Sequence, residues 1–169
     1  MKVAITGHRI EEYQGTEADR TFKWIESMGG WMADRGMTEI ISGMAAGADL
    51  WWAQQHQKQE IPLHGYVPYW KQALNWETEW IMFWDEMILD CTDVTVFGKS
   101  EPYDVTLFHK RNEAMVADAD EMLVVWKEGK STGGTYSTFQ KWKATGKPWH
   151  WYDPLTNTVK HGHGETIDE

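Results

Sequence analysis

Residues 121–146 read EMLVVWKEGKSTGGTYSTFQKWKATG and indicate a strand, a glycine-rich turn and a helix in direct succession. The apolar run 121–126 is short and continuous, which is typical of a central strand buried on both faces of a sheet. The polar turn leads into a helical pattern that runs through Thr145 and ends at Gly146, a residue type common just after helices. This stretch predicts an α/β protein.

The rest of the chain repeats the same strand–turn–helix unit. Strands are predicted at 3–6, 39–42, 63–67, 93–97 and 149–152, and helices from 16 or 19 to 35, at 48–59, around 74–88 and at 105–118. Strict alternation favours parallel strands with helices on both faces of one sheet. We expect a single Rossmann-like domain over residues 1–153. A polar tail over residues 154–169 should follow, starting with a short hairpin and mobile at its end.

The composition restricts the class of partner. The chain of 169 residues has a formal net charge of −10 and one cysteine, Cys91. A single cysteine excludes an internal disulfide, and no apolar run is long enough for a signal peptide or a membrane span. We therefore expect a cytoplasmic protein without a membrane partner. The acidic excess repels a phosphate backbone and the basic residues are scattered, which disfavours nucleic acid. A small anionic ligand stays compatible with this charge.

Four predicted loops follow strands and should meet at the carboxyl edge of the sheet, where such folds bind ligands. Three of them contain glycines and enter a helix, whose free N–H groups favour anions. His8 and Arg9 offer positive donors, and Arg111 and Asn112 are expected to reach the same pocket from the helix before the central strand. The candidate ligand-binding residues are Gly7, His8, Arg9, Ser42, Gly43, Gly47, Asp49, Pro68, Arg111, Asn112, Ser131, Thr132, Gly133, Gly134 and Thr135.

These segments, in this order, resemble the SLOG superfamily. The matching residues are Thr6-Gly-His-Arg9, Ser42-Gly-Met-Ala-Ala-Gly-Ala-Asp49, Arg111-Asn112 and Ser131-Thr-Gly-Gly-Thr135, and the match spans roughly residues 1–150. The likeness is strongest to the YpsA-like and DNA-processing-protein-A-like branches and more distant to the cytokinin-activating LOG enzymes. The resemblance implies a Rossmann-like fold that binds nucleotides or nucleotide-derived signals at these loops. Some members are phosphoribohydrolases, and others bind single-stranded DNA or sense cyclic messengers.

One position departs from the LOG enzymes in a way that bears on catalysis. Their glycine-rich motif ends in a glutamate that acts beside an arginine, and Thr138 stands at that place here. A hydroxyl supplies neither the charge nor the acid–base range of a carboxylate, so hydrolysis by that route is disfavoured. Glu113 and Asp49 are the candidates for a substitute acid.

The sequence thus favours a protein that binds a nucleotide or a nucleotide-derived small molecule, for sensing or sequestration. Two alternatives stay open: a nucleotide N-glycosidase or phosphoribohydrolase with a different acid, and a DNA-associated or protein-interaction module. Tyr69 or Trp70 is a candidate for stacking on the base. We expect a homo-oligomer, because Trp76, Trp80 and Trp84 recur at helical spacing and suit core packing or a dimer face.

No cofactor and no metal are expected. His161 and His163 invite a metal interpretation, but two histidines in a polar terminus lack third and fourth ligands.

Overall fold

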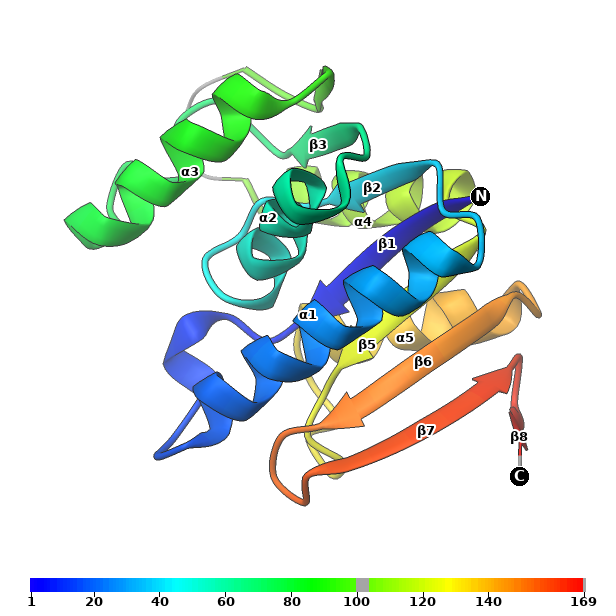
Figure 1. Cartoon of the computed structure of the whole chain (residues 1–169). Helices are drawn as coiled ribbons and strands as arrows, with labels where there is room; N and C mark the ends of the chain where they lie inside the picture. Colours follow the sequence, from blue (N-terminus) through cyan, green and yellow to red (C-terminus); the bar gives the residue numbers. More distant parts are fainter. Residues whose placement is uncertain (100–103, 169) are drawn as a thin grey trace.

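The computed structural model describes residues 1–99 and 104–168, whose strands form one sheet in the order β4-β3-β2-β1-β5-β6-β7-β8 (Figure 1). Strands β1 to β6 are parallel, whereas β7 and β8 are antiparallel to their neighbours. The strand bounds are β1 Lys2–Gly7, β2 Glu39–Ser42, β3 Leu63–Val67, β4 Asp93–Val96, β5 Glu121–Val125, β6 Pro148–Asp153, β7 Thr158–His163 and β8 Thr166–Asp168. The predicted α/β class with a mostly parallel, Rossmann-like sheet is confirmed.

Helices cover both faces of this sheet. The helix bounds are α1 Glu17–Asp34, α2 Ala48–Gln59, α3 Thr78–Asp90, α4 Val105–Asp118 and α5 Gly134–Ala144, with a short 3₁₀ turn over Ile10–Glu12. Helices α1 and α2 pack together on one face, and α3 packs beside α2 (Figure 1). Helices α4 and α5 pack together on the other face. Because the parallel strands share one direction, the loops before these helices meet at one edge.

The core divides into two buried clusters, one on each face of the sheet. The first joins Ile25 and Met32 of α1 to Val3, Ile5 and Leu123, and the second joins residues of α4 and α5 to strands β5 and β6. Alternation along β5 sends Leu123 to one cluster and its neighbours to the other, as a strand covered on both faces requires.

The tryptophans of α3 pack within the chain. Trp84 is buried and its Nε1 donates to Gln72 Oε1 at 3.0 Å. The indole of Trp80 lies 6.0 Å from that of Trp51 on α2, between ring centroids. Through these contacts, Trp80 and Trp84 pack α3 against the rest of the chain, in agreement with the core-packing interpretation.

The segment expected as a polar tail contributes β7 and β8. Strand β7 pairs with β6 from Pro148↔His163 to Asp153↔Thr158, and β8 then pairs with β7. Trp149 anchors this hairpin, because its Nε1 donates to Gly164 O at 2.9 Å.

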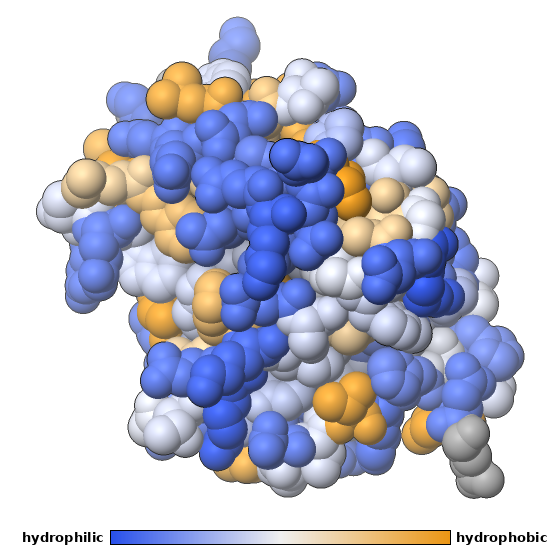
Figure 2. Space-filling view, in the orientation of Figure 1, coloured by the Kyte–Doolittle hydropathy of each residue, from blue (hydrophilic) through white to orange (hydrophobic). Residues whose placement is uncertain are grey.

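The face of the molecule seen in Figure 2 is mainly hydrophilic, with apolar side chains in separate small patches. Among the described residues, no helix has both the length and the apolar content needed to cross a bilayer.

Candidate ligand-binding site

A cavity of about 600 Å³ opens at the carboxyl edge of β1 and β5. Its wall combines the loop after β1, the start of α2, one side of α4, and the loop that leads from β5 into α5. Ten of the predicted residues line it: Gly7, His8, Arg9, Asp49, Arg111, Asn112, Thr132, Gly133, Gly134 and Thr135. Five other predicted residues, Ser42, Gly43, Gly47, Pro68 and Ser131, are not among its lining residues.

Ser42 and Gly47 support the cavity from behind. The buried Ser42 Oγ donates to Asp49 O at 2.7 Å and accepts from Met44 N at 3.1 Å, which fixes the loop before α2. Gly47 has φ of +116°, and a Cβ there would lie 2.8 Å from the backbone oxygen of His8. The glycine therefore lets the loop after β2 lie against the loop after β1. Its role is to shape the site, and it does not line the cavity.

Gly43 provides the surface on which two buried charged groups meet. A Cβ at this position would lie 2.8 Å from Arg111 Nη1 and 2.9 Å from Asp49 Oδ2. The carbonyl oxygen of Gly43 accepts from Arg111 Nη1 at 2.6 Å and from Gln72 Nε2 at 3.1 Å. Any larger residue at position 43 would displace the guanidinium, so this close approach depends on glycine.

Arg111 carries a buried guanidinium that borders the cavity. Its Nε donates to Asn112 Oδ1 at 2.7 Å, which turns the two neighbouring side chains into one unit. Burial lowers the Arg111 pKa to about 10, and the Asp49 charge opposes that shift. Burial raises the Asp49 pKa to about 6, although Arg111 and the backbone N–H of Ala45 favour its ionised form. The Arg111 guanidinium nonetheless stays a cation at neutral pH, because its pKa lies well above 7.

Two guanidinium groups lie near the ring of Phe108 on α4. The Cζ of Arg9 is 5.4 Å from the ring centroid and the Cζ of Arg111 is 5.5 Å from it. Arg9 is exposed at the mouth of the cavity and Arg111 is buried at its wall. The arrangement sets a planar aromatic surface beside two cations, which suits a ligand with both a ring and an anionic group.

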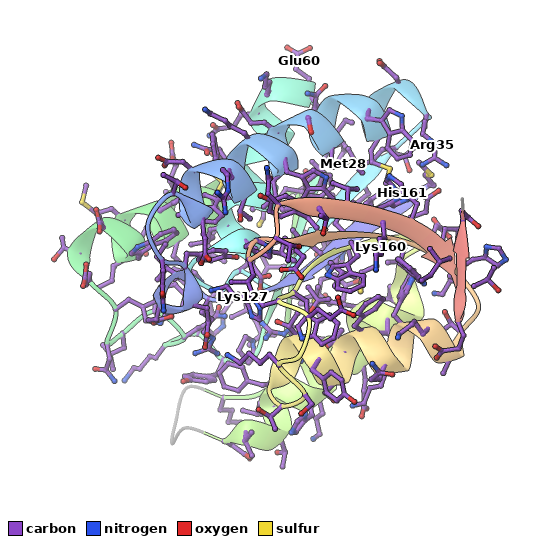
Figure 3. The ribbon with its side chains drawn as sticks, turned by 90° about the horizontal axis from the view of Figure 1, so that it is seen from below. Met28, Arg35, Glu60, Lys127, Lys160 and His161 are labelled. Carbon is purple, nitrogen blue, oxygen red and sulfur yellow. The ribbon has the colours of Figure 1, made fainter. Side chains whose placement is uncertain are left out.

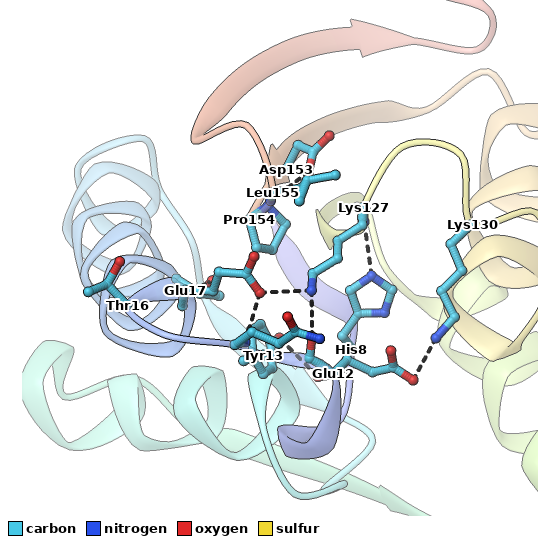
Figure 4. A network of polar contacts seen from close by, with 12 residues as sticks. His8, Glu12, Tyr13, Thr16, Glu17, Lys127, Lys130, Asp153, Pro154 and Leu155 are labelled. Atoms are coloured by element: carbon cyan, nitrogen blue, oxygen red, sulfur yellow. Dashed lines mark hydrogen bonds and ion pairs between the residues drawn. The ribbon is translucent and has the colours of Figure 1, made fainter.

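His8 is neutral in this fold, and its predicted role as a positive donor is wrong. Its Nε2 accepts from the backbone N–H of Lys127 at 2.9 Å, so that nitrogen carries no proton (Figure 4). Burial and the nearby charge of Lys130 lower the His8 pKa to about 4. The remaining Nδ1–H makes His8 a neutral hydrogen-bond donor.

A polar network joins the two loops that flank His8 (Figure 4). Lys127 Nζ lies 2.7 Å from Glu17 Oε1 and donates to Glu12 O at 2.6 Å. Lys130 Nζ lies 2.5 Å from Glu12 Oε1, and both residues line the cavity. These contacts hold the loop after β5 against the loop after β1, so the mouth of the cavity has a defined shape.

Helix α5 begins at the cavity wall. Gly133 has φ of +97° and precedes the helix, and Gly134 and Thr135 form its first turn. The N–H groups of a first turn have no partner inside the helix, so they are available to an anion in the cavity. Thr138, at the place of the LOG glutamate, is buried and lines the same cavity.

Three side chains considered for chemistry lie elsewhere. Glu113 does not line the cavity, and its Oε1 pairs with Lys141 Nζ at 3.5 Å on the outer side of α4 and α5. Tyr69 and Trp70 do not line the cavity either, although the Tyr69 ring packs edge-on against Phe108 with 5.9 Å between centroids. The aromatic side chain that lines the cavity is Phe108. Sequence reasoning missed Phe108, Lys130, Glu11 and Glu12. The one signal for Phe108 was its place one helical turn before Asn112, on the side of the helix that the Arg–Asn pair shares.

Two solved structures have a similar fold. DNA processing protein A from Streptococcus pneumoniae superposes with a TM-score of 0.62 and 16% sequence identity, over 90% of this chain and 49% of that chain. A structural-genomics target designated TM1055 superposes with a TM-score of 0.55 and 14% identity, over 88% of this chain and 71% of that chain. The chain has the fold of these two proteins. It spans about half the length of DNA processing protein A.

The likeness is one of fold. No protein-family model matches the sequence, and no curated protein matches it. The Rossmann-like fold implied by the loop motifs is therefore supported by superposition at low identity.

Proposed function

We propose that this protein binds a nucleotide or a nucleotide-derived small molecule in the cavity at the carboxyl edge of β1 and β5. The observation that carries the proposal is the pair Arg9 and Arg111 around Phe108. Among the described residues, neither guanidinium forms an ion pair with a carboxylate; their contacts are the Phe108 ring, the Gly43 carbonyl and the Asn112 amide. The Asp49 charge acts on both cations without an ion-pair contact, and the two cations together favour a ligand that brings further negative charge.

The three parts of a nucleotide each have a matching surface. The first turn of α5 and the two guanidinium groups suit a phosphate. The Phe108 ring lines the cavity beside the guanidinium groups and is the aromatic side chain a base would contact, and Asp49 offers a carboxylate that can accept from a ribose hydroxyl. The cavity volume of about 600 Å³ lies in the range usual for small-molecule sites.

The test is a ligand screen with the purified chain. The protein is incubated with a panel of nucleoside monophosphates and diphosphates, filtered, and the retained molecules are identified by mass spectrometry. Retention of one intact nucleotide at about one molecule per chain, lost in Arg111→Met and kept in Lys110→Met, supports the proposal. Lys110 is the matched control, because it is exposed on the same helix and does not line the cavity. Retention of no nucleotide by the unaltered chain contradicts it.

A hydrolase is the second candidate, and the observation that favours it is Asp49. This carboxyl group lines the cavity, and burial raises its pKa to about 6, a value suited to exchanging a proton near neutral pH. Release of a free base and a sugar phosphate during the screen, abolished by Asp49→Asn, would establish it. Unchanged turnover in that variant would exclude Asp49 as the acid.

DNA association is the third candidate, and it rests on the name of DNA processing protein A. The charge of the chain is −10, and Glu11 and Glu12 border the same cavity as the cations, so the site lacks a positive field extending along a strand. Salt-sensitive retention on a single-stranded oligonucleotide would favour this role over the small-molecule one.

A further inference from the structure

A second cavity, of about 440 Å³, lies at the amino edge of the parallel strands, between the end of α1 and strands β6 to β8. Its side chains include Trp31, Arg35, His150, His161, His163 and Asp168. Arg35 and His161 lie close to each other at this place in Figure 3. The two histidines of the HGHG segment thus belong to a strand of the sheet and face other titratable groups.

A continuous chain of hydrogen bonds crosses three strands at this cavity. Arg35 Nη1 and Nη2 donate to Glu121 Oε2 and Oε1 at 3.0 and 3.1 Å. His150 Nε2 lies 2.7 Å from Glu121 Oε2, and His150 Nδ1 lies 2.7 Å from His161 Nδ1. Glu121 and His150 are both buried. The position of the proton in each hydrogen bond therefore restricts where the proton of the next hydrogen bond can lie.

The protons of this chain can be counted. Burial opposes ionisation of Glu121, but the hydrogen bonds from His150 and Arg35 keep its pKa below the usual value, so it is a carboxylate. A carboxylate only accepts, and His150 Nε2 must therefore carry hydrogen. The two Nδ1 atoms at 2.7 Å then share one proton between them. A further proton fits on His161 Nε2 and leaves this contact intact.

A fourth proton does not fit. With both imidazoles fully protonated, two N–H groups would point at each other across 2.7 Å, and two positive charges would adjoin the Arg35 guanidinium. The folded pair thus accepts one positive charge, whereas the unfolded chain accepts two below the ordinary histidine pKa of about 6.5. His150 and His161 are directly opposite each other in the β6–β7 ladder, so their contact holds these strands together.

We propose that the His150–His161 pair is an acid-sensitive clasp that holds the β7–β8 hairpin on the sheet and opens when both imidazoles are protonated. In residues 1–99 and 104–168, no three or more histidine, cysteine, aspartate or glutamate side chains are placed so that they could hold a metal ion. The chemistry proposed for the pair is proton exchange. This inference does not depend on the proposed nucleotide function.

The groups around the clasp act in opposite directions. Arg35 from α1 and His150 from β6 disfavour charge on His161, and Asp168 from β8 favours it. Glu121 from β5 pairs with His150, and His163 lies beside Asp168 with 3.4 Å between Nδ1 and Oδ1. Burial, first, and then His150 and Arg35 lower the His161 pKa below its ordinary value. The folded state therefore binds fewer protons than the unfolded state below about pH 6.5, and stability falls as the pH falls.

The test compares the intact chain with His161→Asn. Asparagine places a hydrogen-bonding group near the position of Nδ1 but does not titrate, so the variant lacks the contact between two imidazoles. We expect the unfolding equilibrium constant of the unaltered chain, from urea titrations at pH 7.5 and 5.0, to rise with acid by up to about tenfold per pH unit more than in the variant. His163→Asn is the matched control on the same strand, and it should keep the pH response of the unaltered chain.

Two measurements on the unaltered chain test the proposal even if the variant folds poorly. Nitrogen-15 NMR of the unaltered chain should show the pair taking up one proton as the pH falls to 5. Hydrogen exchange of the β7 amides should accelerate only when the second proton binds. Full protonation of both imidazoles with β7 still protected would overturn the proposal. An equal pH response in the unaltered chain and His161→Asn would also overturn it.

Discussion

The two cavities at opposite edges of the sheet contain similar residue types and differ in how their charges are satisfied. At the amino edge, the exposed Arg35 forms a two-pronged bond with the buried Glu121, which also accepts from His150, so the buried carboxylate is paired within the chain. At the carboxyl edge, the buried guanidinium of Arg111 is held by a backbone carbonyl and a side-chain amide. A paired carboxylate suits a structural role, and a guanidinium whose hydrogen bonds go to neutral acceptors, with the Asp49 charge near it but in no ion pair, suits an incoming anion.

The largest effect should come from Arg111→Met. Loss of a charge-assisted bond to a ligand anion costs about 2–3 kcal/mol, so the affinity for the tightest-binding nucleotide of the panel should fall about 100-fold in calorimetry. The free energy of unfolding should change by less than about 1 kcal/mol, because the substitution also removes a buried charge. Lys110→Met should leave the affinity unchanged. A large loss of stability in Arg111→Met would show that Arg111 has a structural role, like the ion pair at the amino edge.

Glu121→Gln should produce the reverse pattern. The neutral amide replaces the carboxylate that accepts from both Arg35 and His150, and the free energy of unfolding should fall by about 2 kcal/mol in urea titrations. Nucleotide affinity should stay within twofold, since the residue lies at the other edge of the sheet. Glu113→Gln is the control for the charge change, because Glu113 is exposed. Weakened binding in Glu121→Gln would mean that the two cavities are coupled.

Acid should strengthen anion binding at the carboxyl edge. Burial raises the Asp49 pKa to about 6, so lowering the pH from 7.5 to 5.5 neutralises a carboxylate beside Arg111. Removing one nearby negative charge should improve sulfate affinity roughly fivefold, or about 1 kcal/mol. Sulfate is the appropriate probe because it does not titrate in this range. The pH response should disappear in Asp49→Asn; its persistence there would assign it to another group.

Phe108→Leu should have an effect of similar size and the most selective one. A base stacked on the ring loses about 1 kcal/mol, so nucleotide affinity should fall about fivefold. Sulfate affinity should remain the same, because no base is present. Trp70→Leu is the matched control, an exposed aromatic side chain that does not line the cavity. Equal losses for nucleotide and sulfate would show that Phe108 positions the guanidinium groups rather than stacking on a base.

The order of the elements could be predicted from the sequence because it rests on local patterns. The apolar run 121–126 and its glycine-rich turn report directly on burial and on helix starts, and the structure has β5 and α5 there. The loops of the candidate site were found for the same reason: each follows a predicted strand. The roles inside those loops were harder, since Ser42 and Gly47 support the backbone where ligand contact was expected.

Contacts that depend on packing could not be predicted. The neutral state of His8 results from a backbone N–H of Lys127, which approaches only once β1 and β5 are paired. The amino-edge cavity depends on the register that sets His150 opposite His161. The register of a hairpin follows from the type of its turn as well as from the turn length. The polar composition of the segment after β6 does not report the turn type.

The position of β1 in the sheet has a consequence for how the chain acquires its structure. Strand β1 lies between β2 and β5, and the Lys2 N–H finds its acceptor on Asp120, 118 residues further along. During synthesis, one edge of the first strand stays without a partner until most of the chain has emerged. We expect this open edge to make the growing chain a substrate for chaperones, and a shortened chain that ends before residue 121 should aggregate.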